Sequence, residues 1–107
     1  MELLRGTLDL LVLKTLSWGP MHGYAVTRWI RSRTGGALDV EDGALYQALY
    51  RMERRGWVES EWGRSENNRR AKFYALTPKG RRELARGTTD LRRYVDAMFD
   101  VLEAETA

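Results

Sequence analysis

The chain has 107 residues, with no cysteine, one histidine and a formal net charge of +3. This length corresponds to about one domain. The lack of cysteine excludes disulfides and thiolate sites, and a single histidine excludes a histidine-rich metal site. The longest apolar run is too short to cross a bilayer and no segment resembles a signal peptide, so we expect a cytoplasmic protein without a metal or cofactor.

The positive charge is concentrated in the middle of the chain. Residues 51–82 contain ten Lys or Arg against four Glu, whereas residues 1–50 are balanced and residues 83–107 carry three Arg against six acids. This distribution is typical of a middle segment that binds a polyanion and of a solvated or self-associating C-terminus. A set of well-solvated surfaces would have the same composition, so charge alone leaves both interpretations open.

Two helices are predicted in the first third of the chain. Over residues 3–17 leucines recur at helical spacing on two faces, which indicates a helix buried from two directions. A glycine and a proline at residues 19–20 end this helix. A second helix is predicted over residues 22–34, where a threonine and two glycines provide the stop.

A third helix is predicted from Asp42 to Arg55, with Glu41 and Asp42 as N-cap and first-turn acids and Gly56 just beyond its end. Its two faces differ. Leucine and methionine at positions 45, 49 and 52 form an apolar face. The remaining side begins with small residues and continues with polar, aromatic and basic ones: Gly43, Ala44, Gln47, Tyr50, Arg51 and Arg54.

Two short β-strands are predicted next, at residues 57–62 and 72–76, because apolar and polar residues alternate in both. The stretch between them, residues 63–71, is polar, turn-prone and basic, so the pair is interpreted as a hairpin with a long, flexible tip, or wing. Its cationic candidates for DNA contact are Arg64, Arg69, Arg70 and Lys72. Trp18, Trp57 and Trp62 are expected to pack in the core and at the base of the wing.

A long last helix is predicted from Thr77 and Pro78, an N-cap residue followed by a proline at the first helical position, to about residue 103. Gly87 is expected to bend or weaken it. The residues with coiled-coil spacing are Leu84, Thr88, Leu91, Val95, Met98 and Leu102. We therefore expect a DNA-binding domain over residues 1–76 and a dimerisation helix over residues 77–107, with packing of this helix on its own domain as the alternative.

Catalytic chemistry has no support in the sequence, and an enzyme is not expected. His22 lacks a partner of the kind that a general base needs, and a histidine after a proline turn is more often a cap or a packing residue. The paired glutamates at positions 59 and 61 are ordinary for a strand surface.

Nucleic-acid binding has composite support. In a helix-turn-helix the second helix enters the major groove with its first residues nearest the bases. Here that helix offers small residues first, then Gln47, which can pair with adenine, and Arg51 and Arg54, which can pair with guanine. These side chains could instead form a solvated face, but a projecting basic wing, suited to phosphate or minor-groove contact, favours DNA.

The chain also resembles the PadR family of winged-helix transcriptional regulators over nearly its whole length. The resemblance rests on the order and spacing of short segments: residues 6–8 (GTL), 19–24 (GPMHGY), 43–46 (GALY), 69–74 (RRAKFY) and 76–80 (LTPKG). The single C-terminal helix is similar to the small subfamily. The family implies a mostly α fold with a small β-hairpin, a winged helix-turn-helix plus a long C-terminal dimerisation helix. Its members are homodimers, usually repressors, on near-palindromic operators.

The resemblance also implies that Tyr46 lies at the DNA surface. A proline commonly follows this tyrosine in the family, and Gln47 stands there instead. Some members of the small subfamily bind flat aromatic drugs between their C-terminal helices. A dimer face or aromatic-effector pocket would draw on Leu8, Val12, Leu84, Leu91, Tyr94, Val95, Met98 and Leu102. A tightly packed dimer core without a cavity is the alternative.

Two further functions stay open at this stage. A winged helix can bind an acidic partner protein through its basic face, or it can sense aromatic drugs and have only incidental affinity for DNA. A preference among duplex sequences would separate DNA regulation from both.

Overall fold

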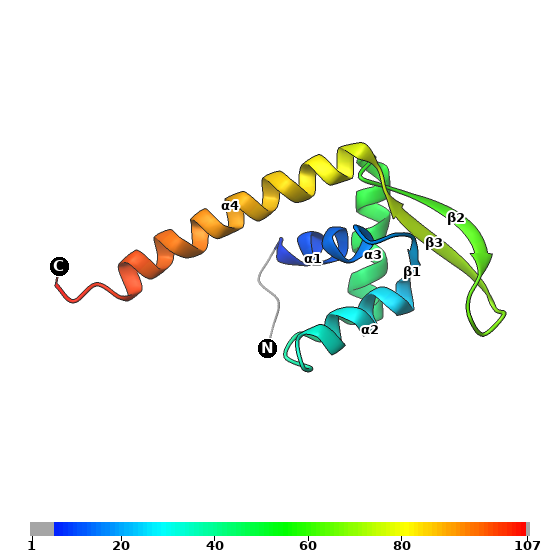
Figure 1. The fold of residues 1–107 in the computed structure, drawn as a ribbon, viewed down its shortest axis with the longest axis horizontal. Helices are drawn as coiled ribbons and strands as arrows, with labels where there is room; N and C mark the ends of the chain where they lie inside the picture. The colour runs from blue at the N-terminus through cyan, green and yellow to red at the C-terminus, as the bar shows by residue number, and fades with distance from the viewer. Residues whose placement is uncertain (1–5, 107) are drawn as a thin grey trace.

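The computed structural model describes residues 6–106. Within them the elements follow in the order α1 (Thr7–Leu16), β1 (Met21–His22), α2 (Gly23–Arg33), α3 (Asp42–Arg54), β2 (Val58–Arg64), β3 (Arg70–Leu76) and α4 (Pro78–Leu102). Helices α1 to α3 pack together, the β2–β3 hairpin projects from one side, and α4 runs away on the other (Figure 1). The mostly α architecture with a wing and a long last helix is therefore confirmed. The predicted helix start at residue 3 lies outside the described residues.

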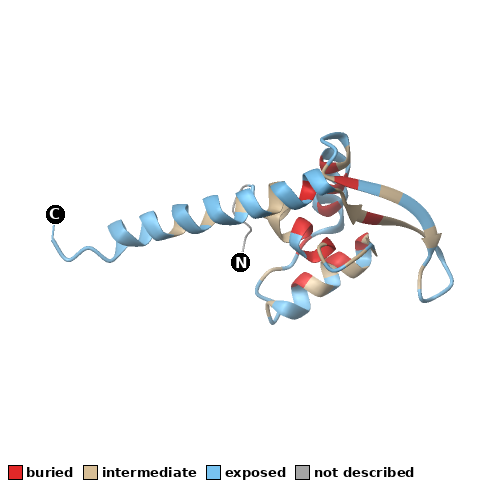
Figure 2. Ribbon diagram, turned by 45° about the horizontal axis from the view of Figure 1, so that its top comes forward, coloured by how far each residue is buried: buried red, intermediate tan, exposed pale blue. Residues whose placement is uncertain are grey.

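The core lies where the first three helices meet (Figure 2). The apolar stripe of α3 supplies its centre, because Leu45, Leu49 and Met52 are fully buried, as their spacing predicts. Hairpin residues Val58 and Tyr74 close it from the wing side. The remaining buried apolar residues are Val12, Leu13, Leu16, Val26, Ile30, Val40 and Ala48.

Side-chain hydrogen bonds cap the first turns of α2 and α4 and explain why these helices begin where they do. Nδ1 of His22 accepts a hydrogen bond from the Ala25 N–H at 3.3 Å, so this histidine is the N-cap of α2. The Thr77 hydroxyl accepts from the Gly80 N–H at 3.0 Å and donates to the carbonyl of Gly56 at 2.6 Å. At α3 Glu41 has the N-cap position, but its side chain makes no capping hydrogen bond.

The sheet has three strands rather than the two predicted. Its order is β1-β3-β2 and it is antiparallel, with Met21 opposite Tyr74 and His22 opposite Phe73. The wing is also more ordered than expected, because pairing between β2 and β3 continues to Arg64 opposite Arg70. The connecting loop is therefore residues 65–69, shorter than the predicted 63–71.

The tryptophans differ from the sequence-based expectation. Trp57 packs against the core, but Trp18 is 59% exposed and Trp62 is 57% exposed. Trp18 lies in the turn after α1, where its ring centre is 5.0 Å from that of Trp29 of α2 and the two rings are tilted by 44°. Trp62 lies on the wing, beyond the reach of the core. Trp18 therefore packs at the surface and not in the core, and the prediction of a packing role is wrong for Trp62, because strand β2 carries it past the edge of the helical domain.

Helix α4 leaves the domain after its first turns. The molecule is 59 Å in its longest dimension, and the outer part of α4 is exposed (Figure 2). Gly87 does not interrupt the helix. A Cβ there would lie 2.4 Å from a methyl carbon of Leu10, so the glycine lets α1 and α4 approach closely. Val12, which was expected at the dimer face or effector pocket, is fully buried within the domain, and that face stays a prediction.

Candidate nucleic-acid interface

The exposed face of α3 lies opposite its buried stripe. Gly43, Gln47, Tyr50 and Arg54 follow at i, i+4, i+7 and i+11, and all four are exposed. The Arg54 guanidinium lies 5.7 Å from the centre of the Tyr50 ring. This face therefore presents one small residue, one amide, one ring and one cation to whatever approaches the helix.

Arg51 lies at the edge of this face and has an intramolecular partner. Its guanidinium donates to Asp9 of α1 at 2.5 Å, across 42 positions of sequence. The Asp9 side chain is mostly covered, whereas that of Arg51 is 44% exposed. The ion pair holds Arg51 toward α1, so a contact with a base requires the guanidinium to turn away from Asp9 or to bridge both partners. Ala44 is exposed on the same edge.

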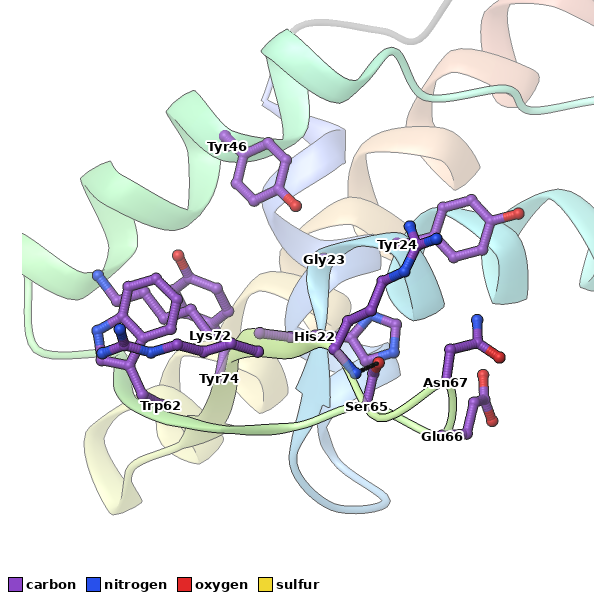
Figure 3. Close-up of a pocket in the computed structure, with 13 residues that line it drawn as sticks. His22, Gly23, Tyr24, Tyr46, Trp62, Ser65, Glu66, Asn67, Lys72 and Tyr74 are labelled. Atoms are coloured by element: carbon purple, nitrogen blue, oxygen red, sulfur yellow. Dashed lines mark hydrogen bonds between the residues drawn. The ribbon is translucent and has the colours of Figure 1, made fainter.

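Tyr46 marks the opposite edge of α3, toward the wing. Its ring points from α3 to the start of α2 (Figure 3). A Cβ built on Gly23 would lie 2.7 Å from the Tyr46 hydroxyl oxygen and 2.8 Å from the ring carbon that bears it. Only a glycine at position 23 leaves room for the tyrosine in this orientation, so Gly23, the first residue of α2, also determines where the side chain of Tyr46 lies.

The inner face of the wing is aromatic and cationic. The register places Trp62 opposite Lys72 and Arg64 opposite Arg70, all on the strand face that also bears Tyr74. The Arg70 guanidinium lies 4.6 Å from the centre of the Trp62 ring. Lys72 Nζ lies 5.8 Å from the Tyr74 ring and 3.8 Å from a carboxylate oxygen of Glu53.

Glu53 of α3 fixes the wing to the helix. Its carboxylate accepts a hydrogen bond from the Ser60 hydroxyl at 2.6 Å, in addition to the ion pair with Lys72. Burial raises the pKa of the Tyr74 phenol, and the negative charge of Glu53 raises it further. Tyr74 is therefore neutral at any physiological pH. Through these contacts the wing strands and α3 have a fixed relative position.

The wing loop reaches back to α2. Glu66 lies 3.5 Å from the Arg28 guanidinium, with both side chains largely exposed, and Arg64 donates to the Asn68 carbonyl at 3.3 Å. Arg69 is exposed at the end of the loop, where its N–H donates to the Ser65 hydroxyl at 3.3 Å. An exposed pair such as Arg28–Glu66 contributes little stability. The loop can therefore yield to a competing anion.

A hollow of about 740 Å³ lies between the wing, the start of α2 and Tyr46 (Figure 3). Five rings line it, from His22, Tyr24, Tyr46, Trp62 and Tyr74, together with three cations, from Arg69, Arg70 and Lys72. Glu66 is the one acid of this lining. A concave surface of rings and cations suits an extended polyanion, because it combines flat contact area with positive charge.

The residues of this hollow were only partly predictable from the sequence. Arg69, Arg70, Lys72 and Tyr46 were among the candidates, whereas His22, Gly23, Tyr24 and Trp62 were not. The alternation of β2 places Trp62 on the same face as Arg64, and that pattern could have indicated Trp62. The remaining three join the hollow only through the contacts of α2 with α3 and β3, which no local pattern reveals.

Comparison with known proteins decides the family. Residues 12–86 match the model of the transcriptional regulator PadR-like family, from the second half of α1 to the first turns of α4. The chain belongs to the PadR-like family. Helices α2 and α3, the wing and every residue that lines the hollow lie within the matched segment.

Solved PadR-like structures share the fold. A PadR family transcriptional regulator from Eggerthella lenta is 30% identical and superposes with a TM-score of 0.82 over 94% of this chain and 86% of its own. A transcriptional regulator from Clostridium thermocellum is 26% identical, with a TM-score of 0.82 over 90% of each chain. Bacillus subtilis PadR in complex with operator DNA is 22% identical, with a TM-score of 0.69 over 78% of this chain and 47% of its own.

PadR-like proteins are transcriptional regulators and not enzymes. Between residues 6 and 106, no group of histidine and acidic side chains is placed to hold a metal ion. In the same part of the chain, none of the helices combines the length and the apolar character that crossing a bilayer needs.

The predicted seam of α4 is divided between two environments. Leu84 packs against the core, and Leu91 and Val95 are half-buried, as is Leu8 of α1. Beyond them Tyr94, Met98 and Leu102 are exposed, together with Phe99 and Val101. One side of the inner half of α4 packs against the chain's own domain, and the outer half presents exposed apolar side chains.

Proposed function

We propose that this protein is a sequence-specific DNA-binding repressor that acts as a homodimer on a near-palindromic operator. The observation that carries the proposal is that Tyr46, at the wing-side edge of the exposed face of α3, and the cationic inner face of the wing line one hollow. A single approach of a duplex can therefore meet both.

In this arrangement α3 enters the major groove. Gln47 and Arg54, on the exposed face, are the side chains that reach base edges, and Gly43 and Ala44 let the backbone come close to the groove wall. Arg64, Arg69 and Arg70 of the wing contact the phosphates or the minor groove beside it. The shared fold of Bacillus subtilis PadR, whose structure contains operator DNA, supports DNA as the partner.

Dimerisation through the outer half of α4 is the second part of the proposal. Five large apolar side chains are exposed on one short stretch of helix, which is costly for a monomer. Their spacing suits a seam between two helices. Two α4 helices that pair in this way would present two copies of α3 to half-sites about one helical turn apart, roughly 34 Å.

Release by a flat aromatic effector is the third part. A ligand that separates the paired α4 helices would change the distance between the two copies of α3 and so weaken operator binding. The exposed Tyr94 ring, next to Leu91, offers a surface on which such a ligand can stack. Titration of planar aromatic compounds into the protein–operator complex tests this part separately.

Selection of random duplexes at physiological salt tests the proposal as a whole. The purified full chain is mixed with a randomised duplex library, and the bound fraction is sequenced. We expect two inverted half-sites about one turn apart. Enrichment of a single half-site would contradict dimeric recognition. No enrichment by folded protein would favour a winged helix that binds an acidic partner protein.

A further inference from the structure

Trp62 is the largest side chain of the hollow and does not belong to the core. It is 57% exposed and lies at the centre of the inner wing face, opposite Lys72 in the strand register. The Arg70 guanidinium lies over its ring at 4.6 Å, and its ring is one of the five that line the hollow (Figure 3). A ring in this position contributes nothing to the core that would account for it.

A free arginine on a strand has many rotamers, and fixing one of them for a phosphate contact costs conformational entropy. A flat indole under the guanidinium restricts those rotamers before the duplex arrives. Tryptophan also attracts a cation more strongly than any other ring does, and the attraction increases when water is excluded. The attraction between the ring and the guanidinium should therefore become stronger once a duplex covers them and excludes water.

We propose that Trp62 is a positioning residue of the DNA-binding face. Its ring holds the Arg70 guanidinium over the hollow, and the sugar–phosphate backbone of the duplex closes over both. This inference rests on the proposed function. Trp62 would then be an uncharged wing residue that raises the affinity for DNA. It would raise the affinity equally for all duplex sequences, because the sugar–phosphate backbone carries no sequence information.

The test measures binding of a fluorescein-labelled duplex of mixed sequence, and of the selected operator, over a range of salt. The variants are Trp62→Leu, Trp62→Phe, Arg70→Gln and the double variant Trp62→Leu/Arg70→Gln. Trp18→Leu is the matched control, because Trp18 is 59% exposed and has Lys14 Nζ 4.8 Å from its ring, but it lies outside the hollow. Circular dichroism and thermal melting compare the folds.

We expect Trp62→Leu to weaken binding to both duplexes roughly three- to tenfold, and Trp62→Phe to retain most of the affinity. In the Arg70→Gln background Trp62→Leu should have little further effect, and Trp18→Leu should bind as the unchanged protein does. Rescue by phenylalanine and coupling to Arg70 separate positioning from a structural role.

Three results would overturn the inference. The first is that Trp62→Leu binds duplex as tightly as the unchanged protein. The second is that Trp62→Leu lowers the affinity equally with Arg70 and in the Arg70→Gln background. The third is that Trp62→Leu lowers the melting temperature and that Trp62→Phe loses as much affinity as Trp62→Leu. In each case the unchanged protein still binds DNA, so the proposed function survives. Failure of the unchanged protein to bind any duplex would overturn both.

Discussion

A glycine and a tyrosine that are 23 positions apart illustrate how single residues shape the candidate interface. We expect Gly23→Ala to displace Tyr46, because the new methyl group would lie within 3 Å of the ring and hydroxyl. Duplex affinity should fall several-fold with little change in melting temperature, since Tyr46 is half exposed and can rotate outward. Anisotropy titration with a labelled duplex measures this. If the affinity is lost because Tyr46 moves, Gly23→Ala should have no added effect in a Tyr46→Ala background.

The sequence assigns Arg51 to contact with a base, whereas in the structure Arg51 is ion-paired with Asp9 of α1. If it reads a base, Arg51→Ala should weaken operator binding by about 1–3 kcal/mol and relax base preference at one position. Asp9→Asn, which removes its partner in α1, should leave that preference intact. Competition between operator and random duplexes measures both variants. An equal loss for Arg51→Ala on both duplexes would reduce its role to phosphate contact.

At the scale of elements the wing is expected to supply phosphate contacts. Arg69→Ala should weaken binding to all sequences and lower the slope of log affinity against log salt by about one, because one fewer counterion is released. The measurement is a salt titration on a duplex of mixed sequence. Arg92→Ala, an exposed arginine on α4, is the matched control. An unchanged slope for Arg69→Ala would argue against a contact between Arg69 and a phosphate.

Helix α4 is expected to hold two protomers together. Met98→Glu places a charge in the apolar row of the outer helix and should shift the protein toward monomer, because a buried unpaired carboxylate is costly. Thr89→Glu adds the same charge on the opposite side of the helix, where the chain is exposed, and should not. Analytical ultracentrifugation compares the two. Equal behaviour of both variants would mean that this row is not the seam.

The elements that the sequence predicted are those with a strong local pattern. The apolar period of α3, the cap of α4 at Thr77 and Pro78, and the alternation of the hairpin all correspond to observed structure. Strand β1 has two residues, too few for any period, and it exists only because β3 offers it an edge. Contacts such as Arg51–Asp9 or Glu53–Ser60 depend on how helices and strands pack, so no spacing in the sequence could have indicated them.

At the scale of the whole molecule, the basic residues gather in the domain and its wing, and the acidic residues gather toward the C-terminus. The positive excess of residues 51–82 covers the end of α3, the wing and the start of α4. Asp96 and Asp100, two of the acids of residues 83–107, lie on the part of α4 that extends away from the domain (Figure 1). Repulsion between DNA and that part of α4 would keep the outer helix away from the duplex and free for a second copy.

The central claim is that each protomer reads DNA with one face and that α4 fixes the distance between two such faces. The most direct test measures the affinity of the protein for the selected operator and for two altered operators. In one the half-sites are moved apart by about half a helical turn, and in the other by about a full turn. Half a turn rotates one half-site to the opposite side of the duplex, so we expect affinity to fall to that of a single half-site. Unchanged affinity at every spacing would contradict the account.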